Sequence, residues 1–467
     1  MTSFQSDALV FFGATGDLAY KKIFPALHAM AKRGNLNVPV IGVAKAGWNL
    51  DQLRARAKDS LEKHGGVDPV AFEKLIASLR YIDGDYQDPK TFTALRRELN
   101  GAKSPAHYLA IPPVLFEKVV EQLAESNCAK GARVIIEKPF GHDLASAQEL
   151  NRVLHGTFDE ADVFRIDHYL GKRAVNNLMA FRFTNTFAEA FWNRHYIESV
   201  QITMAEDFGV QGRGGFYDQT GTIRDVVQNH LFQVLSNLAM EPPVDLESDS
   251  VRDEKVKVLK AIPPIEDKNL VRGQFRGYRD ENGVAKGSQT ETFAALKLEI
   301  NSWRWKGVPF YIRAGKYLPR TCTEVLGKFH KPPTVIPDSL LVENHLRLRL
   351  SPESTVAIEM MTLAPEAEGL SLQTTEMVAS HSPRGDEMDA YERVLGAAMT
   401  GDRTFFARED YVEEAWRIVD PVLKKQTPIY EYSPNTWGPD EAERVGPSGG
   451  WHNPGGKEAF AVASEAA

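Results

Sequence analysis

The fold of this chain follows from one stretch near its N-terminus, Ala8-Leu9-Val10-Phe11-Phe12-Gly13-Ala14-Thr15-Gly16-Asp17-Leu18-Ala19. Its first five residues form a continuous apolar run, which is typical of a strand buried on both faces of a parallel sheet. Apolar residues at helical spacing follow the glycines, and Pro25 stands in the first turns of that helix or at a kink. The stretch predicts a strand, a turn and a helix, the opening of an α/β domain.

The glycine turn itself predicts a dinucleotide site. Gly13 permits a tight turn, Gly16 lets the backbone approach a pyrophosphate, and the next helix presents its first N–H groups to the anion. The spacing G-x-x-G-x-x-A departs from G-x-G-x-x-G, so a plain strand-to-helix turn is the alternative interpretation. Its position after the first strand of a βαβ pattern favours the dinucleotide.

Strands and helices alternate as far as residue 170. Further strands are expected at 38–43, 80–82, 107–111, 133–136 and from 163, and helices near 51–63, 88–100, 114–126 and 143–155. This alternation predicts a doubly wound, Rossmann-like domain over residues 1–170, with its ligands at the carboxyl ends of the strands.

A second domain is expected over residues 171–467. Segments such as 197–204, 290–300, 346–350 and 356–360 alternate apolar and polar residues, which predicts an α+β domain with a large, mostly antiparallel sheet. Residues 241–255 and 280–290 are interpreted as solvated loops, and the chain from Tyr432 onward as an extended surface tail.

Composition limits the classes of function. A net charge of -8 gives no general attraction for nucleic acid or an anionic membrane, so an anionic substrate needs a local cationic pocket. Cys128 and Cys322 make neither a disulfide framework nor a zinc pattern. With no visible secretory signal and no apolar run near the ~20 residues of a membrane span, we expect a cytoplasmic protein.

The end of the second strand bears on the cofactor. NAD enzymes place an acid there for the ribose 2′-hydroxyl, but residues 36–50 contain none, and Lys45 follows Val43 and Ala44. A lysine suits a 2′-phosphate, although it is also a common surface residue. We therefore expect NADP as cofactor, with NAD as a possible secondary one.

Two further strands end in residues suited to a site. The strand at 107–111 ends in Pro112-Pro113, which fix a rigid turn, and the strand at 133–136 ends in Glu137-Lys138-Pro139. Lys138 then points at the cofactor crevice, unless it is a solvated strand-end charge. The sequence does not tell whether these proline peptide bonds are cis.

The densest run of titratable groups is Phe164-Arg165-Ile166-Asp167-His168-Tyr169-Leu170-Gly171-Lys172-Arg173. If the chain turns helical at Tyr169, His168, Tyr169 and Lys172 converge, and such a cluster suits a phosphate monoester. If Asp167 and His168 are extended, their side chains point to opposite faces and serve different partners.

In the second domain a helix is expected from about Tyr217 to Ala239. Asp225 and His230 lie about 140° apart on an α-helix, so one ligand must lie across it to touch both. The alternative for His230 is a hydrogen-bonded core histidine. Glu206 and Lys316 stand at the ends of neighbouring strands.

Taken in order, these motifs resemble the glucose-6-phosphate dehydrogenase family from the glycine turn almost to the C-terminus. The motifs that carry the resemblance are 13–19, 137–141, 165–172, 212–215, 223–230, 312–316, 389–393 and 414–418. The resemblance implies oxidation of glucose 6-phosphate at C1 to 6-phosphogluconolactone with NADP, the first step of the oxidative pentose phosphate pathway. It also implies a homodimer or homotetramer, and no metal.

The resemblance assigns roles residue by residue. His230 would be the general base, hydrogen-bonded to Asp167. The substrate would be held by Lys138, His168, Tyr169, Lys172, Glu206, Asp225 and Lys316. The cofactor would be held by Gly13, Thr15, Gly16, Asp17, Leu18, Lys22, Lys45, Pro112 and Lys138.

Three positions depart from the family pattern. Arg173 replaces a glutamate, Thr321 replaces a basic residue with Arg320 one place earlier, and Lys45 replaces an arginine that is frequent there. Two alternatives therefore stay open: a dehydrogenase of another aldose or aldose phosphate, and a catalytically silent homologue with an assembly or regulatory role.

Overall fold

The computed structural model describes residues 5–333, 342–364, 371–381, 387–425 and 427–455. The chain divides into two compact units. Unit 1 comprises residues 1–173, 243–253 and 386–413, and unit 2 comprises residues 174–242, 254–385 and 414–467. The linear division expected after residue 170 falls near the first change of unit, but two later segments also belong to unit 1.

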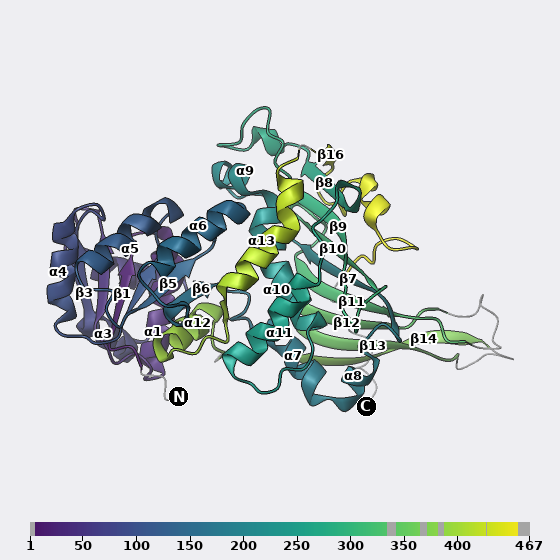
Figure 1. Cartoon of the computed structure of the whole chain (residues 1–467), viewed down its shortest axis with the longest axis horizontal. Helices are drawn as coiled ribbons and strands as arrows, with labels where there is room; N and C mark the ends of the chain where they lie inside the picture. Colours follow the sequence, from purple (N-terminus) through teal and green to yellow (C-terminus); the bar gives the residue numbers. More distant parts are fainter. Residues whose placement is uncertain (1–4, 334–341, 365–370, 382–386, 426, 456–467) are drawn as a thin grey trace. The chain divides into compact units, whose positions relative to one another are not determined.

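Unit 1 is built on a seven-stranded sheet in the order β15-β6-β5-β4-β1-β2-β3. Figure 1 labels β3, β1, β5 and β6 of this sheet. Its strands are β1 (Ala8–Phe12), β2 (Val40–Ala44), β3 (Leu79–Asp83), β4 (Pro105–Leu109), β5 (Arg133–Glu137), β6 (Val163–Ile166) and β15 (Phe406–Ala407). All pair in parallel except β15, which adds to β6 in the antiparallel sense. This is the expected doubly wound sheet, with one edge strand that comes from far along the chain.

The helices of unit 1 connect these strands. They are η1 (Ala19–Ile23), α1 (Phe24–Lys32), α2 (Leu50–Lys63), α3 (Pro69–Ser78), α4 (Pro89–Leu99), η2 (Pro113–Leu115), α5 (Phe116–Glu125), α6 (Leu144–His155), η3 (Glu160–Asp162) and α12 (Ala390–Thr400). Pro25 lies at the junction of η1 with α1, inside one continuous helix from Asp17, where its missing N–H removes one helical hydrogen bond. Helix α3 is not among the helices expected from the sequence; its N-cap Asp68 accepts the N–H of Ala71 at 3.0 Å.

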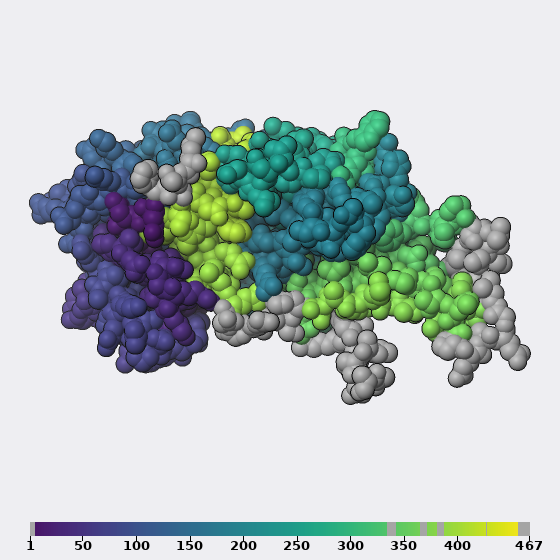
Figure 2. Space-filling model, turned by 90° about the horizontal axis from the view of Figure 1, so that it is seen from below, coloured from purple at the N-terminus to yellow at the C-terminus, as the bar shows by residue number. Residues whose placement is uncertain are grey.

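The core of unit 1 surrounds β1, whose five residues are all buried. Phe11 meets Phe24 of α1 edge to face, with ring centroids 5.8 Å apart. Helix α12 completes the core, since Val394, Leu395 and Ala398 are buried in the same cluster. Figure 2 shows the yellow-green atoms of this returning segment against the purple N-terminal atoms.

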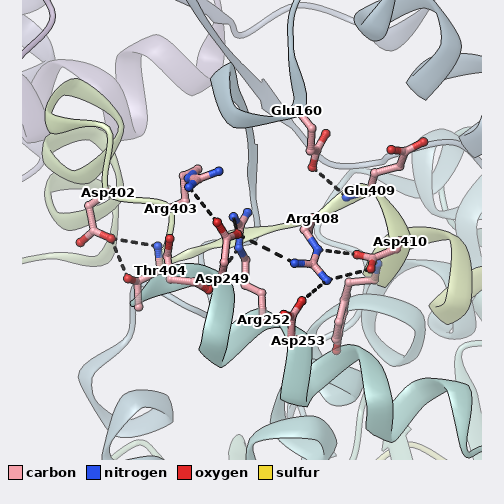
Figure 3. Close-up of polar contacts among 12 residues, drawn as sticks. Glu160, Asp249, Arg252, Asp253, Asp402, Arg403, Thr404, Arg408, Glu409 and Asp410 are labelled. Carbon is pink, nitrogen blue, oxygen red and sulfur yellow. Dashed lines mark hydrogen bonds and ion pairs between the residues drawn. The ribbon is translucent and has the colours of Figure 1, made fainter. Parts of the chain in front are cut away.

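An ion-pair network joins the two returning segments of unit 1 (Figure 3). Arg408 pairs with Asp410 at 2.8 Å and with Asp253 at 2.6 Å, while Arg403 pairs with Asp249 at 2.9 Å. Asp249 also pairs with Arg252. The residues from 248 onward belong to α11 (Ser248–Lys260), so the expectation of a solvated loop over 241–255 is wrong there. The charges are tolerated because each arginine meets a carboxylate.

Unit 2 is built on a nine-stranded sheet in the order β14-β13-β12-β11-β7-β10-β9-β8-β16 (Figure 1). Its strands are β7 (Ile197–Ala205), β8 (Leu270–Phe275), β9 (Phe293–Glu299), β10 (Pro309–Gly315), β11 (Cys322–Phe329), β12 (His345–Ser351), β13 (Ser354–Leu363), β14 (Leu372–His381) and β16 (Ile429–Tyr432). Only β10 with β7 and β16 with β8 pair in parallel. The prediction of a large, mostly antiparallel sheet is confirmed.

The helices of unit 2 include α7 (Arg173–Thr184), α8 (Thr186–Phe191), α9 (Gly214–Thr222), η4 (Ile223–Leu231), α10 (Phe232–Ala239), η5 (Asp267–Asn269), η6 (Tyr278–Asp280), α13 (Glu409–Leu423) and η8 (Asp440–Val445). The helix expected from about Tyr217 to Ala239 is not one regular helix. Gly221 has φ 67°, which interrupts α9, and η4 is π-helical before α10 resumes the α form.

Residues 433–455 are not the extended surface tail that their composition predicts, and residues 456–467 lie outside the described residues. Residues 433–455 pack on unit 2, where Trp451 is buried and donates its indole N–H to Ala442 O at 3.1 Å. The Arg313 guanidinium donates to His452 O at 2.9 Å and lies 5.0 Å from the Trp451 ring centroid. Buried aromatic area from one tryptophan outweighs the local glycine and proline signals.

Among the described residues, no helix is both long and apolar enough to cross a membrane.

Candidate active site

The glycine turn lies at the carboxyl end of β1, as predicted. Gly13 has φ 84°, and a Cβ at this position would stand 2.2 Å from Ala110 O, so no other residue fits. The chain turns helical after Gly16, and the N–H groups of Asp17 and Leu18 begin a helix that continues through η1 and α1. First-turn N–H groups have no intrahelical acceptor, so the turn fits a pyrophosphate.

The ends of β4 and β5 lie beside this turn in the sheet order. Pro112 has φ -57° and precedes η2, and Lys138 follows β5 directly. The peptide bond between Lys138 and Pro139 is cis. Parallel strands end on the same edge, so Gly13, Thr15, Gly16, Pro112 and Lys138 share the carboxyl edge of the sheet of unit 1.

The titratable run turns immediately after β6, which ends at Ile166. Asp167 is buried, and one of its carboxylate oxygens accepts the N–H of Tyr169 at 3.0 Å. The N–H of Gly171 then reaches His168 O at 3.1 Å, and that of Lys172 reaches Tyr169 O at 3.1 Å. Asp167 and His168 therefore stand in a turn, and the extended arrangement considered from the sequence does not occur.

This turn gathers the predicted phosphate-binding side chains within unit 1. The Lys172 ammonium lies 3.8 Å from the centroid of the Tyr169 ring, and the His168 ring lies 5.8 Å from that ring. Arg173 points elsewhere, to Glu387 at 3.5 Å, and its side chain is 55% exposed. The replacement at Arg173 thus adds a surface ion pair.

Tyr391 of α12 belongs to the same cluster. It is not among the site residues expected from the sequence, although the motif 389–393 that contains it carries part of the family resemblance. Its ring stacks on His168 with centroids 6.0 Å apart and planes 14° apart, and Lys22 Nζ lies 5.8 Å from its centroid. The sequence signal for Tyr391 as a site residue is its aromatic side chain within that family motif. Its neighbours could not be read from sequence, because α12 belongs to a segment that returns from the far end of the chain.

Glu137 connects three elements of unit 1. Tyr108 of β4 donates a short hydrogen bond to Glu137 Oε1, and Tyr391 also bonds to the Glu137 carboxyl group. Removal from water raises the pKa of Glu137 from 4.5 to about 7, although the hydrogen bond from Tyr108 and the charge of Lys138 act in the opposite direction. The residue before Lys138 is thus a carboxyl group that titrates near neutrality.

The predicted residues of unit 2 form a second group. Lys316 Nζ pairs with Glu206 Oε2 at 2.5 Å, and the Lys316 ammonium lies 5.4 Å from the centroid of the buried Tyr217 ring. Removal from water, followed by the charge of Asp225, raises the pKa of Tyr217 well above 10. Glu206, Lys316 and Asp225 therefore surround Tyr217, a residue that the sequence reading used only to start a helix.

The π-helical form of η4 changes the relation between Asp225 and His230. The i→i+5 hydrogen-bonding pattern puts more residues into each turn than an α-helix has, so residues five apart lie closer to one face of the helix, and the separation of about 140° expected from an α-helix is wrong. His230 is buried, and its N–H donates to Asn229 Oδ1 at 2.7 Å. Both side chains can thus face one ligand.

Thr321 stands where a basic residue was expected. Its hydroxyl donates to Asp207 Oδ1 at 2.5 Å and accepts the N–H of Asp207 at 3.0 Å. The threonine thereby fixes the residue next to Glu206. Asp167 belongs to unit 1 and His230 to unit 2, and their pairing stays a prediction.

The end of β2 holds acids that the sequence reading did not place there. Lys45 Nζ pairs with Asp85 Oδ2 at 2.7 Å, and Asp83 Oδ1 accepts the N–H groups of Ala46 and Gly47 at 2.9 and 2.8 Å. Both acids come from the end of β3. Lys45 therefore lies beside acidic residues, even though residues 36–50 contain none.

Comparisons with known proteins cover nearly the whole chain. A model described as "Glucose-6-phosphate dehydrogenase, NAD binding domain" matches residues 10–177, and one described as "Glucose-6-phosphate dehydrogenase, C-terminal domain" matches residues 179–452. The chain is 41% identical over 454 residues to glucose-6-phosphate 1-dehydrogenase 1 of Mycobacterium tuberculosis, with 96% of this chain and 97% of that protein covered.

Solved structures agree with this similarity. The glucose-6-phosphate 1-dehydrogenase of Mycobacterium avium superposes with a TM-score of 0.91 at 42% identity, covering 97% of this chain and 99% of that one. A glucose-6-phosphate dehydrogenase in complex with its substrate glucose 6-phosphate gives 0.90 at 35% identity, covering 97% and 100%.

Proposed function

The chain belongs to the glucose-6-phosphate dehydrogenase family, and from this premise we propose that it oxidises glucose 6-phosphate at C1 with NADP as hydride acceptor. The observation that carries the proposal is the family match over both units, together with a cationic and aromatic cluster in unit 1. The product is 6-phosphoglucono-1,5-lactone, and the reaction opens the oxidative pentose phosphate pathway.

The substrate phosphate binds Lys138, His168, Tyr169 and Lys172 in this proposal. The turn after β6 supports it, because the chain's own hydrogen bonds hold the Lys172 ammonium over the Tyr169 ring at 3.8 Å. A phosphate dianion offers several acceptors to this cluster. Binding energy at the phosphate, remote from C1, then positions the reacting carbon.

The sugar hydroxyls bind Glu206, Asp225 and Lys316, and His230 removes the proton of the C1 hydroxyl. Asp167 is proposed to hold the His230 tautomer and stabilise the imidazolium. The short pair of Lys316 with Glu206 and the π-helical relation of Asp225 to His230 support a shared sugar site.

The cofactor binds along the carboxyl edge of the sheet of unit 1. Gly13, Thr15, Gly16, Asp17 and Leu18 receive the pyrophosphate, Lys22 and Lys45 the remaining phosphate charge, and Pro112 and Lys138 the nicotinamide end. When bound, the nicotinamide supplies the hydride acceptor, and the residues named here bind and orient the two reactants.

A homodimer or homotetramer is also proposed. Large apolar side chains on β13 and β14 support it, because Leu363, Met377 and Val378 are exposed. Light scattering coupled to size-exclusion chromatography measures the oligomeric state directly, and a monomer at micromolar concentration would contradict the proposed oligomer.

A cytoplasmic location is proposed as well, since both Cys128 and Cys322 are buried free thiols.

The test of function is a spectrophotometric assay with purified protein. Glucose 6-phosphate, free glucose and other aldose phosphates are each tried with NADP and NAD, and we expect reduction of NADP to be fastest with glucose 6-phosphate. A faster reaction with another aldose phosphate would favour the alternative substrate. No reaction with any sugar would leave the assembly or regulatory role.

The base is tested with His230→Asn, which should lower kcat by about a hundredfold to ten-thousandfold while glucose 6-phosphate still binds, since a positioned base contributes that order of rate. His330→Asn is the matched control, because His330 is exposed. Substantial turnover by His230→Asn would remove it as the base.

A further inference from the structure

An ion pair occupies the place where the proposed cofactor presents its 2′-substituent. Lys45 follows β2 directly, and its ammonium lies 2.7 Å from Asp85, which follows β3. These are neighbouring parallel strands, with Ala44 opposite Asp83 in register. In doubly wound sheets the residue after the second strand meets the adenosine ribose, so Lys45 and Asp85 stand together at that position.

The backbone beside Lys45 is held in place by Asp83. Its Oδ1 accepts the N–H groups of Ala46 and Gly47 and the hydroxyl of Tyr81, at 2.9, 2.8 and 2.9 Å. These bonds lower the pKa of Asp83, the one from Ala46 most of all. Because Asp83 holds the two N–H groups that follow Lys45, it restrains the turn that carries Lys45 next to Asp85.

The other side of Asp85 is held by Tyr86. The Gly13 N–H donates to the Tyr86 hydroxyl at 2.9 Å, the hydroxyl donates to Val43 O at 3.1 Å, and the ring packs edge-on against Phe12 at 5.8 Å. In the strand order Lys45, after β2, therefore lies between the glycine turn, after β1, and Asp85, after β3, while Tyr86 next to Asp85 contacts the glycine turn.

The two carboxylate oxygens of Asp85 have different partners. Oδ1 accepts the N–H of Gln87 at 2.9 Å, while Oδ2 accepts only from Lys45 among the contacts of the described residues. The pair is open to solvent, with Lys45 71% and Asp85 39% exposed. Exposed ion pairs contribute about 0–1 kcal/mol, so a ligand can displace one partner at little cost.

We propose that Asp85 sets the cofactor preference of this chain, competing with the 2′-phosphate of NADP for Lys45 and accepting the ribose 2′-hydroxyl of NAD. This deepens the proposed function and rests on it. With NADP, the 2′-phosphate replaces Asp85 as the partner of Lys45, and the carboxylate of Asp85 repels the phosphate. With NAD, the ion pair stays intact and Asp85 bonds to the hydroxyl, so both cofactors are used.

The charge states agree with this geometry. The hydrogen bond to Asp85 raises the pKa of Lys45, and the same bond lowers the pKa of Asp85. Across the neutral range the lysine is therefore cationic and the carboxylate anionic. The Asp85 carboxylate and the 2′-phosphate therefore compete for the Lys45 ammonium, and neutralising Asp85 leaves only the phosphate to bind it.

The test is Asp85→Asn, which keeps the oxygen that accepts from Gln87 and removes the charge. Calorimetric Kd values are measured for adenosine 2′,5′-bisphosphate, which has the 2′-phosphate, and for 5′-AMP, which has the hydroxyl. We expect Asp85→Asn to bind the bisphosphate about fivefold more tightly than the wild type does, which is equivalent to one surface ion pair of ~1 kcal/mol. The Kd of 5′-AMP should stay unchanged or rise by up to about threefold, because a neutral acceptor is weaker.

Turnover provides the second readout, as the ratio of kcat/KM for NADP to that for NAD with glucose 6-phosphate. This ratio should rise about fivefold to fifteenfold in Asp85→Asn, in line with the Kd values. Glu149→Gln is the matched control, because it also removes one exposed carboxylate from an ion pair of unit 1, that with Arg152 at 2.5 Å.

The outcomes separate the two proposals. If the wild type reduces neither cofactor with glucose 6-phosphate, the proposed function fails, while the Kd values still test Asp85. If the wild type is active but Asp85→Asn shifts both probes equally, or no more than Glu149→Gln does, the role of Asp85 is refuted.

Discussion

Glu137→Gln offers the sharpest test of the electrostatics inside unit 1. Glutamine keeps an oxygen that accepts the hydroxyl of Tyr108 and imitates the protonated carboxyl group. The folded state raises the pKa of Glu137 from 4.5 to about 7, so it holds the proton more tightly than the unfolded chain does. This contribution to stability is complete below pH 4.5 and is lost as the pH rises through 7.

The magnitude follows from the two pKa values. The difference of about 2.5 units corresponds to at most about 3 kcal/mol, at 1.36 kcal/mol per unit. Between pH 5 and pH 8 the wild type should therefore lose about 2–3 kcal/mol relative to Glu137→Gln. The variant should be the more stable protein at pH 8.

His107 acts in the opposite direction over part of this range. Burial lowers its pKa from 6.5 to about 4, so its contribution is present above pH 6.5 and is lost as the pH falls through 4. Both proteins contain His107, so its effect cancels in the difference between them.

The assay is urea denaturation followed by far-UV circular dichroism at pH 5 and pH 8, from which the free energy of unfolding is obtained. The exposed Glu117→Gln is the matched control, and its difference from the wild type should be the same at both pH values. If the difference between Glu137→Gln and the wild type changes by less than about 0.5 kcal/mol, the half-buried carboxyl group of Glu137 does not titrate as argued.

Three further results are expected. Arg408→Met should lower the free energy of unfolding by about 2–3 kcal/mol in urea titrations, because Asp253 and Asp410 lose a half-buried partner; a change under ~0.5 kcal/mol would contradict this. Lys172→Met should raise KM for glucose 6-phosphate about tenfold or more while oxidation of free glucose stays nearly unchanged, since only the phosphate contact is lost, and equal loss with both sugars would contradict it. Native protein at pH 8 should react with Ellman's reagent far more slowly than urea-unfolded protein, because burial raises the pKa of Cys128 and brings that of Cys322 to about 11; rapid release of both thiols would refute this.

Much of unit 1 could be predicted because its signals are local. An apolar run of five residues, a glycine turn and a helix predict one unit from β1 to α1, and β2 and β5 of the parallel sheet also contain apolar runs. Gly13 was identified for the right reason, since the turn requires φ 84°. The candidate site residues were named largely through the family's motifs.

The errors arose where packing overrides local pattern. Residues 248–255 are charged enough to suggest a loop, but ion pairs to a returning segment hold them in a helix. The glycine-rich chain after Tyr432 looked like a tail, but Trp451 is buried on the sheet of unit 2. A π-helical segment carries no periodicity that an α-helical reading can detect.

The sequence by itself determined the class of fold, the family and the residue types available for chemistry, because hydrophobic periodicity and short motifs act over neighbouring residues. Only the tertiary structure decided which polar groups meet. In it the Tyr391 ring stacks on His168, Tyr108 donates a hydrogen bond to Glu137, and Asp85 pairs with Lys45. Each pair joins residues from separate elements. Strand order and returning segments determine such pairs, and neither is written in the spacing of residues along the chain.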